Sequence, residues 1–138
     1  MNHPTLMHRW FEEVWNQGRT ETIDELLAPD VVGHGLVDAA GQEVRGVAAF
    51  KEFYHSFRET FPDIHITVED TISEGDKLVG RCQVTGCHRG GGIGVAPTGK
   101  TVSFGGACIV RIKDGRIAES WNHFDFLSLY QQVGCKVP

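Results

Sequence analysis

Three residues near the C-terminal end of the chain are of types that can carry out acid/base chemistry. Trp121, His123 and Asp125 are spaced two residues apart in a segment that is expected to form a strand. Because side chains alternate between the two faces of a strand, these three are predicted to point the same way. A histidine titrates near neutral pH, and an apolar pocket brings a carboxylic acid toward the same range. The pattern predicts a proton-transfer site with Asp125 and His123 as candidate catalytic residues and Trp121 as a substrate-binding wall.

Both candidate catalytic residues also have a structural interpretation. Asp125 directly precedes a short apolar segment that begins at Phe126 and is expected to be helical, and aspartate is favoured as a helix cap. His123 could instead be a core or interface histidine that bonds to a backbone group. Capping would not exclude a catalytic role for Asp125.

The strand expected to pair with residues 116–125 offers space opposite the large side chains. Asp114-Gly115 predicts a tight hairpin. A two-residue loop would place Trp121 opposite Cys108, whereas a three-residue loop with a bulge would place it opposite Ala107. The partners are small in either case: Gly105, Gly106, Ala107 and Cys108. They predict a cavity, although the glycines can also mark a bend where the sheet curls.

Other side chains are candidates for binding a substrate in the same space. His34 lies between two glycines, and His88 ends a predicted long strand. Arg81 and Gln83 share one face of that strand and His88 belongs to the other, so only one of these sets can face the cavity. An apolar lining would come from three aromatic residues: Trp10, Phe57 and Phe104.

The predicted elements are helices first and strands afterwards. Helical spacing predicts a helix from Thr5 that stops before Gly18, a short helix between residues 20 and 29, and a third between residues 47 and 62. Alternation predicts strands over residues 31–37, 64–69, 77–88, 101–112 and 116–125, followed by a short helix before Gly134. This order is typical of an α+β domain with helices on one face of a curved antiparallel sheet.

Length, charge and composition limit the class of protein. The 138 residues suit a single domain over 1–138 with a real core and a modest cavity. The formal net charge of −5 argues against nucleic acid and anionic membrane surfaces as partners. No apolar run is long enough to span a bilayer and the first residues do not resemble a signal peptide, so a cytoplasmic location is expected.

The sequence predicts neither a metal site nor a phosphate-binding loop. The cysteines are interpreted as small apolar residues, and Cys82, Cys87 and His88 are split between the two faces of one strand. The glycine-rich segment 89–94 is not followed by a helix, as a phosphate loop requires, and is interpreted as a flap over the pocket mouth. We therefore expect no cofactor and no metal.

Motifs along nearly the whole chain resemble those of the SnoaL-like polyketide cyclases of the nuclear transport factor 2-like superfamily. The motifs lie at residues 11–18, 26–34, 61–63, 68–70, 74–77, 86–90, 97–100, 111–117 and 131–134, and include Trp121 with Asp125. The resemblance implies a cone-shaped, cystatin-like α+β roll in which three helices of the N-terminal half pack against a strongly curved antiparallel sheet. In this family an acidic residue often follows the tryptophan, and here Asn122 takes that position.

The resemblance also implies a function. The characterised cyclases close a ring by intramolecular aldol condensation of a polyketide ester, with an aspartate at the position of Asp125 as acid/base and without cofactor or metal. We expect a cofactor-independent enzyme that acts next to a carbonyl of an apolar small molecule, with polyketide ester cyclisation as the first expectation and a homodimer through the sheet. Two alternatives stay open: a non-catalytic binding module, and an isomerase, dehydratase or hydrolase on the same fold.

Overall fold

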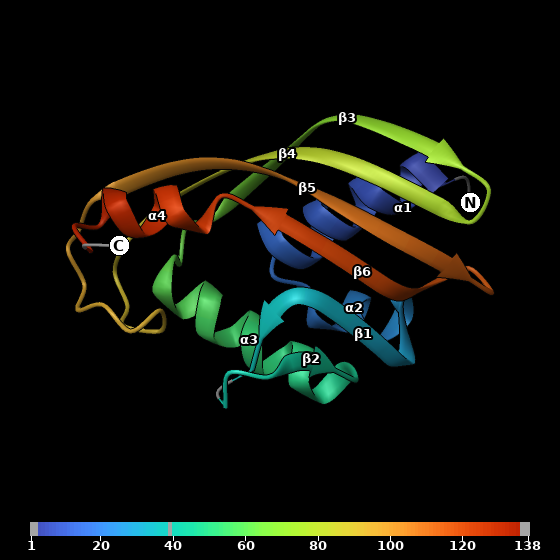
Figure 1. Ribbon diagram of the computed structural model, residues 1–138, viewed down its shortest axis with the longest axis horizontal. Helices are drawn as coiled ribbons and strands as arrows, with labels where there is room; N and C mark the ends of the chain where they lie inside the picture. Colours follow the sequence, from blue (N-terminus) through green and yellow to red (C-terminus); the bar gives the residue numbers. More distant parts are fainter. Residues whose placement is uncertain (1–2, 39, 136–138) are drawn as a thin grey trace.

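The computed structural model describes residues 3–38 and 40–135, in which helices lie against one curved sheet (Figure 1). The helical segments are α1 (His3–Arg9), η1 (Trp10–Asn16), α2 (Thr20–Leu26), α3 (Val47–Thr60) and α4 (Phe126–Gln132). The strands are β1 (Leu27–Val37), β2 (Glu43–Arg45), β3 (His65–Glu74), β4 (Lys77–Cys87), β5 (Thr101–Lys113) and β6 (Arg116–Phe124). The α+β class predicted from the sequence is confirmed.

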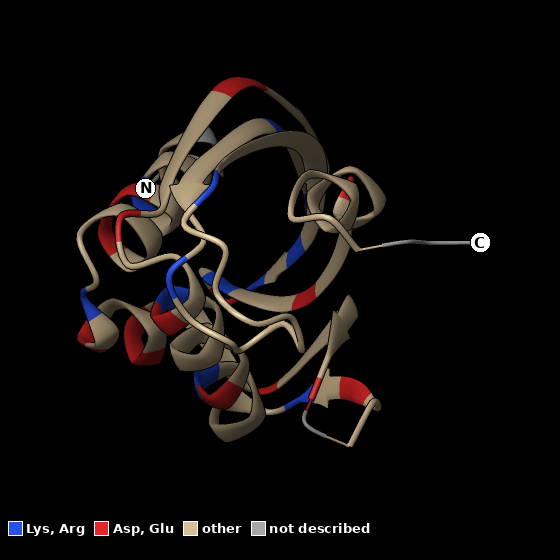
Figure 2. Cartoon of the chain, turned by 90° about the vertical axis from the view of Figure 1, so that its left-hand side faces the viewer, with Lys and Arg blue, Asp and Glu red and all other residues tan. Residues whose placement is uncertain are grey.

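The strands are arranged in the order β2-β1-β6-β5-β4-β3. Neighbouring strands are antiparallel except β1 and β6, which run parallel. The sheet was expected to be antiparallel, and this parallel pair is a correction to that expectation. The long connection through α3 and β3 to β5 lets β6 return beside β1 in the same direction. The sheet bends into an arc (Figure 2), which gives it a concave inner face and a convex outer face.

Apolar side chains of the helices fill the inner face. In α3 they recur at three- and four-residue spacing, which places them on one side of the helix. Trp15 of η1 lies against the rings of Phe50, Phe53, Tyr54 and Phe57, at centroid distances between 5.1 and 6.3 Å. Burial of rings of this size is a dominant source of core stability. None of the helices within the described ranges is long and apolar enough to cross a membrane.

Element boundaries agree with the sequence-based prediction to within a few residues. The hairpin at Asp114-Gly115 is present, and both residues have positive φ angles of 53° and 75°, as a tight hairpin loop requires. The first helix begins at His3, ahead of Thr5, and the second ends at Leu26. The prediction lacks β2, because a strand of three residues is too short to show an alternating pattern.

A β-bulge in the hairpin between β5 and β6 shifts the pairing of the two strands. Ile112 pairs with Ile117, but Arg111 pairs with Glu119, so Ala118 is an extra residue on β6. Ile117 and Ala118 are both buried, although neighbouring residues of a regular strand point to opposite faces. The bulge therefore interrupts the alternation just before the segment that the sequence marks as a site.

Beyond the bulge, each side chain of β6 points to the face of the sheet opposite to the one it would occupy in a hairpin without a bulge. Trp121 lies opposite Ile109 and His123 opposite Ala107, so both registers predicted for this hairpin are wrong. A shift by one residue exchanges the two faces of a strand. As a result, Trp121 and His123 lie on the outer face, and Asn122 points to the inner face.

Candidate functional site

A cleft of about 610 Å³ opens on the inner side of the sheet. Its walls come from α3, the end of β1, the loop between β4 and β5, and α4. Pockets of roughly 300–1,000 Å³ are typical of sites for small organic ligands. The apolar part of the lining includes Phe53, Phe57 and Phe126, and the polar part includes Glu52 and Tyr130.

A smaller cavity of about 50 Å³, which we call the inner chamber, lies between the helices and the sheet. The cleft and the inner chamber share Leu36, Phe53, Phe57 and Phe126, so these side chains separate the two spaces. Apart from one asparagine, the residues that line the inner chamber are apolar: Phe11, Trp15, Leu36, Phe53, Phe57, Ile64, Ile66, Val84, Phe104, Phe124 and Phe126. Such walls favour hydrocarbon rings over polar groups.

Asn122 is the polar residue of the inner chamber, and it also lines an adjoining cavity of about 30 Å³. Its Nδ2 donates to the carbonyl oxygen of His34 at 2.9 Å and to Oγ of Ser120 at 3.0 Å. The backbone of Asn122 packs directly on Gly35, where a Cβ atom would come within 2.2 Å of the Asn122 carbonyl oxygen. The contacts with β1 fix the amide in one orientation.

Among the described residues, three ionisable side chains line the cleft: Asp38, Glu52 and Tyr130. Oδ1 of Asp38 accepts two backbone N–H groups of the β1–β2 loop at 2.9 Å. The Tyr130 hydroxyl donates to the carbonyl oxygen of Ile93 at 3.3 Å. Glu52 is exposed and makes no hydrogen bond or ion pair with the rest of the described chain, so it is the carboxylate of the cleft without a protein partner.

The glycine-rich loop between β4 and β5 borders the cleft through Gly92 and Ile93. Ser56 on α3 donates to the carbonyl oxygen of Gly92 at 3.2 Å, and Tyr130 on α4 holds Ile93. The loop therefore lies where a flap over the cleft would lie, attached to one helix on each side.

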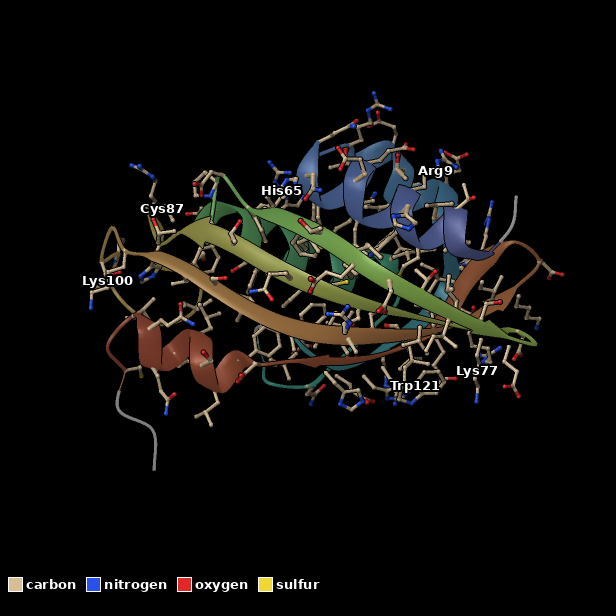
Figure 3. All side chains as sticks on the ribbon, turned by 90° about the horizontal axis from the view of Figure 1, so that it is seen from above. Arg9, His65, Lys77, Cys87, Lys100 and Trp121 are labelled. Atoms are coloured by element: carbon tan, nitrogen blue, oxygen red, sulfur yellow. The ribbon has the colours of Figure 1, made fainter. Side chains whose placement is uncertain are left out.

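The outer face of the sheet carries a charged network. Nε2 of His34 is 2.6 Å from Oε2 of Glu119, and Nδ1 of His34 contacts Oε1 of Glu43. The hydrogen bond with Glu119, followed by that with Glu43, raises the pKa of His34, and the hydrogen bond with His34 lowers the pKa of Glu119. The His34 ring stacks on Trp121 at 5.5 Å, and Nζ of Lys77 lies 5.6 Å from the centre of the Trp121 ring (Figure 3).

The two predicted catalytic residues do not line the cleft or the inner chamber. Both side chains are exposed, and Oδ1 of Asp125 accepts the backbone N–H of Ser128 at 2.9 Å, which makes Asp125 the cap of α4. Trp121 and His123 share one face of β6, but the bulge turns that face outward, and Asp125 lies beyond the end of the strand. The prediction that they enclose a cavity is therefore wrong, and a catalytic role for Asp125 and His123 stays a prediction.

Three of the predicted substrate-binding residues do line cavities. Phe57 and Phe104 lie in the wall of the inner chamber, and Trp10 lines the adjoining 30 Å³ cavity. Helical spacing places Trp10 of η1 and Phe57 of α3 on the sides of their helices that face the sheet. Alternation along β5 places Phe104 on its inner face. A role in binding stays a prediction for each of them.

The polar residues predicted to bind a substrate lie elsewhere. His34 and Trp121 belong to the outer-face network. Arg81 and Gln83 lie on the outer face outside that network, where Arg81 pairs with Asp70 at 3.0 Å and Gln83 donates to Ser103 at 2.8 Å. The residues that alternate with Arg81 and Gln83 along β4 face inward. The sequence left open which of the two sets faces the cavity, and the structure shows that it is not the set of Arg81 and Gln83.

His88 is fully buried but does not border the cleft or the inner chamber. Its ring packs against Phe61, and its Nδ1 accepts the backbone N–H of Thr98 at 3.2 Å. Because Nδ1 is the acceptor, the ring carries its proton on Nε2 when it is neutral. His88 thereby holds the two ends of the glycine-rich loop together.

Several lining residues were missed by sequence reasoning. Phe53 shares its helix with the predicted Phe57, so the four-residue spacing was an available signal. Asn122 was noted only as a departure from the family pattern, although its alternation with Phe124 places both on one face of β6. What the sequence does not show is the bulge that decides which face is inward.

Two other features of the described chain fit neither covalent chemistry nor an apolar ligand. Burial raises the pKa of Cys82 and Cys108 to about 12, so both remain protonated thiols. A charged groove of about 600 Å³ lies beside the β5–β6 hairpin, with Arg111, Lys113 and Arg116 in its lining, which does not suit an apolar ligand. Within the described residues, no three His, Cys, Asp or Glu side chains are placed to hold a metal ion.

The fold and the chamber define a class of protein, namely a small α+β roll that encloses apolar space between its helices and a curved sheet. Comparison with known proteins identifies the family within that class. The model of the SnoaL-like polyketide cyclases matches residues 5–133, and the chain belongs to this family.

Relatives and solved structures agree with this assignment. Aklanonic acid methyl ester cyclase DnrD of Streptomyces peucetius is 25% identical over 88% of this chain and 84% of its own length. Nogalonic acid methyl ester cyclase of Streptomyces nogalater is 28% identical over 87% of this chain and 89% of its own. The structure of IdmH from Streptomyces antibioticus is 31% identical, covers 96% of this chain and 99% of that one, and superimposes with a TM-score of 0.81. The nuclear transport factor 2-like fold expected from the resemblance is confirmed.

Proposed function

We propose that this protein is a cyclase that holds an apolar polyketide-type ester in the cleft and the inner chamber and closes a ring next to one of its carbonyl groups. The observation that carries the proposal is the pair of adjoining cavities on the inner face, which share a wall of three phenylalanines. Two relatives named for the cyclisation of methyl esters support this class of substrate.

The reaction would be an intramolecular aldol addition. A base removes a proton from a carbon next to a carbonyl, the enolate carbon forms a bond to a second carbonyl carbon of the same molecule, and the new alkoxide takes up a proton. Atoms and oxidation state are conserved, so the chemistry calls for no redox cofactor. Apolar walls would fold the flexible chain so that the two carbons meet, which is a large part of the catalytic task for a reaction within one molecule.

Two carboxylates are candidates for the proton transfer. Glu52 is favoured by the geometry, because it lines the cleft and has no partner among the described residues. Asp125 is favoured by the resemblance, and it starts the helix whose first residue, Phe126, lines the cleft. Removal of a general base lowers turnover by roughly 10²–10⁴-fold, so the two assignments can be separated by kinetics.

The test is an assay of ring closure with aklanonic acid methyl ester and nogalonic acid methyl ester, followed by chromatography because the mass of the substrate does not change. Wild-type protein should convert at least one of the two. A loss of at least a hundredfold in kcat for Glu52→Gln, with Asp125→Asn within a few-fold of wild type, would assign the acid/base role to Glu52. Loss of activity in Asp125→Asn alone would move the acid/base role to Asp125. Absence of conversion together with tight binding would reject the cyclase.

A non-catalytic binding module is the second candidate, and one observation favours it. The inner chamber has no ionisable side chain in its described lining, and Asp125 acts as a helix cap. Under this reading the protein would bind either ester without accelerating ring closure, and neither Glu52→Gln nor Asp125→Asn would alter the rate.

We further propose a homodimer that forms through the outer face of the sheet. Directly paired residues form a row across five strands there, and the row is largely apolar: Ile72, Val79, Ile109, Trp121 and His34. Ile72 leaves 68% of its surface exposed, and a contiguous apolar row of this kind is what an interface between protein surfaces uses. Light scattering should give twice the mass of one chain for wild type and the mass of one chain for Ile72→Asp. A monomeric wild type would reject the dimer.

A further inference from the structure

In the described lining of the inner chamber, one side chain is polar, the amide of Asn122. Its orientation is set by chemistry, because the carbonyl oxygen of His34 can only accept a hydrogen bond and must therefore face the nitrogen of the amide. The second hydrogen of Nδ2 is used by Oγ of Ser120. The donors of Asn122 are thus fully committed to the protein.

The oxygen of the same amide is in the opposite situation. No described residue donates a hydrogen bond to Oδ1 of Asn122. Oδ1 of Asn122 is also not fully buried. In the described part of the chain, Nε2 of His88 is the only side-chain nitrogen or oxygen that is both fully buried and without a partner, and Oδ1 has no partner, so it must be at least partly accessible. Oδ1 is therefore an accessible acceptor at the border of apolar space, where an unpaired acceptor is unfavourable once water is displaced.

We infer that Asn122 determines specificity by accepting a hydrogen bond from an enolic or phenolic O–H on an otherwise apolar ring that enters the inner chamber. A carbonyl or ether oxygen at this place would face the lone pairs of Oδ1 and gain no bond. The inference rests on the proposed site but not on its catalysis. For an aldol substrate, the consequence is that Asn122 selects the enol of a dicarbonyl unit over its keto form.

Entry of a ring requires the wall between the cleft and the inner chamber to move. A chamber of about 50 Å³ is smaller than the roughly 150 Å³ that holds a benzene ring in an engineered cavity. Phe53 and Phe57 stack at 5.6 Å and Phe126 meets Phe57 at 6.3 Å, and all three are only partly buried. Rotation of these rings into the cleft would enlarge the chamber and leave Asn122 at its end.

The experiment compares 2-naphthol with naphthalene, which differ in one hydroxyl group and are neither substrates nor products of a ring closure. Wild-type protein should bind 2-naphthol roughly tenfold more tightly, because naphthalene leaves Oδ1 unpaired. Asn122→Leu replaces the amide by an apolar group of similar size, so the preference should fall to near onefold. Ser120→Ala is the matched control, since it removes a partner of Nδ2 and keeps the Oδ1 acceptor, and it should retain the preference.

A second measurement keeps the inference testable if Asn122→Leu does not fold. In spectra of ¹⁵N-labelled wild-type protein, the side-chain NH₂ signals of Asn122 should shift with 2-naphthol and much less with naphthalene. Equal affinities for the two compounds in wild type, a preserved preference in Asn122→Leu, or an unmoved Asn122 signal would each overturn the inference. Ring closure is not measured here, so a protein without cyclase activity that still prefers 2-naphthol would reject the proposed enzyme and leave this inference in place.

Discussion

The two faces of β6 show how one strand can carry two unlike environments. On the inner face, Asn122 and Phe124 line apolar space between the sheet and the helices. On the outer face, Glu119 and Trp121 join a charged network with His34. The outer face holds the larger number of titratable groups and the inner face holds the apolar cavities, so abundance of reactive side chains is a poor guide to the ligand site in this protein.

Loss of a large ring from the inner face should give the largest effect on stability. Phe104 is 4% exposed and lines the inner chamber, so Phe104→Ala should lower the free energy of unfolding by about 3–5 kcal/mol. Thr85 on the outer face of β4 is exposed, and Thr85→Ala should stay within about 0.5 kcal/mol of wild type. Urea titrations followed by circular dichroism measure both. Similar losses for the two variants would contradict the distinction between the faces.

The outer-face network should make stability depend on pH. The pKa of His34 is raised in the folded protein, so its contribution is fully present below the unfolded pKa of about 6.5 and is lost as the pH rises through the folded pKa. His34→Gln should therefore be destabilised by about 1–2 kcal/mol at pH 6 and should approach wild type at alkaline pH. Unfolding curves from pH 5.5 to 9 provide the comparison, and a difference independent of pH would exclude a protonated His34.

The cap of α4 should have a moderate effect that is independent of the sheet. Asp125→Ala removes the acceptor of the Ser128 N–H and should cost about 1 kcal/mol, whereas Asp125→Ser can still cap and should recover most of it. Thermal unfolding of the two variants measures this. If Asp125→Ser were as unstable as Asp125→Ala, capping would not describe the role of this residue.

The smallest effect is expected at the loop beside the cleft. Tyr130→Phe removes one hydrogen bond of 3.3 Å to Ile93 and should change the free energy of unfolding by about 0.5 kcal/mol. Amide exchange within residues 89–95 should become faster, while that of the sheet stays unchanged. Unchanged exchange in the loop would show that the bond does not restrain it.

Much of this fold follows from local sequence patterns. Gly46 and Pro62 bracket α3 because glycine and proline interrupt helical geometry, and Asp114-Gly115 sets the hairpin because both residues tolerate positive φ. The α+β order of elements and the aromatic lining by Phe57 and Phe104 could also be predicted, because helical and strand periodicities are visible without the rest of the molecule.

The failure at the site has one physical cause. Ala118 has no property that marks it as an extra residue, and the bulge is stabilised by long-range packing of two successive buried side chains. A one-residue shift then exchanges the faces, so Asp125 was expected inward and Asn122 was not singled out. The parallel pairing of β1 with β6 is equally non-local, and it is what brings His34 to Trp121 and its carbonyl to Asn122.

The indole N–H signals of two tryptophans test most directly that the ligand site is on the inner face. Trp15 lines the inner chamber and Trp121 lies on the outer face, and each signal can be assigned from a Trp→Phe variant. On titration of ¹⁵N-labelled protein with 2-naphthol, our expectation is that the Trp15 signal shifts in step with the Asn122 side chain while the Trp121 signal stays in place. A shift at Trp121 with Trp15 unmoved would contradict it and place the ligand on the outer face.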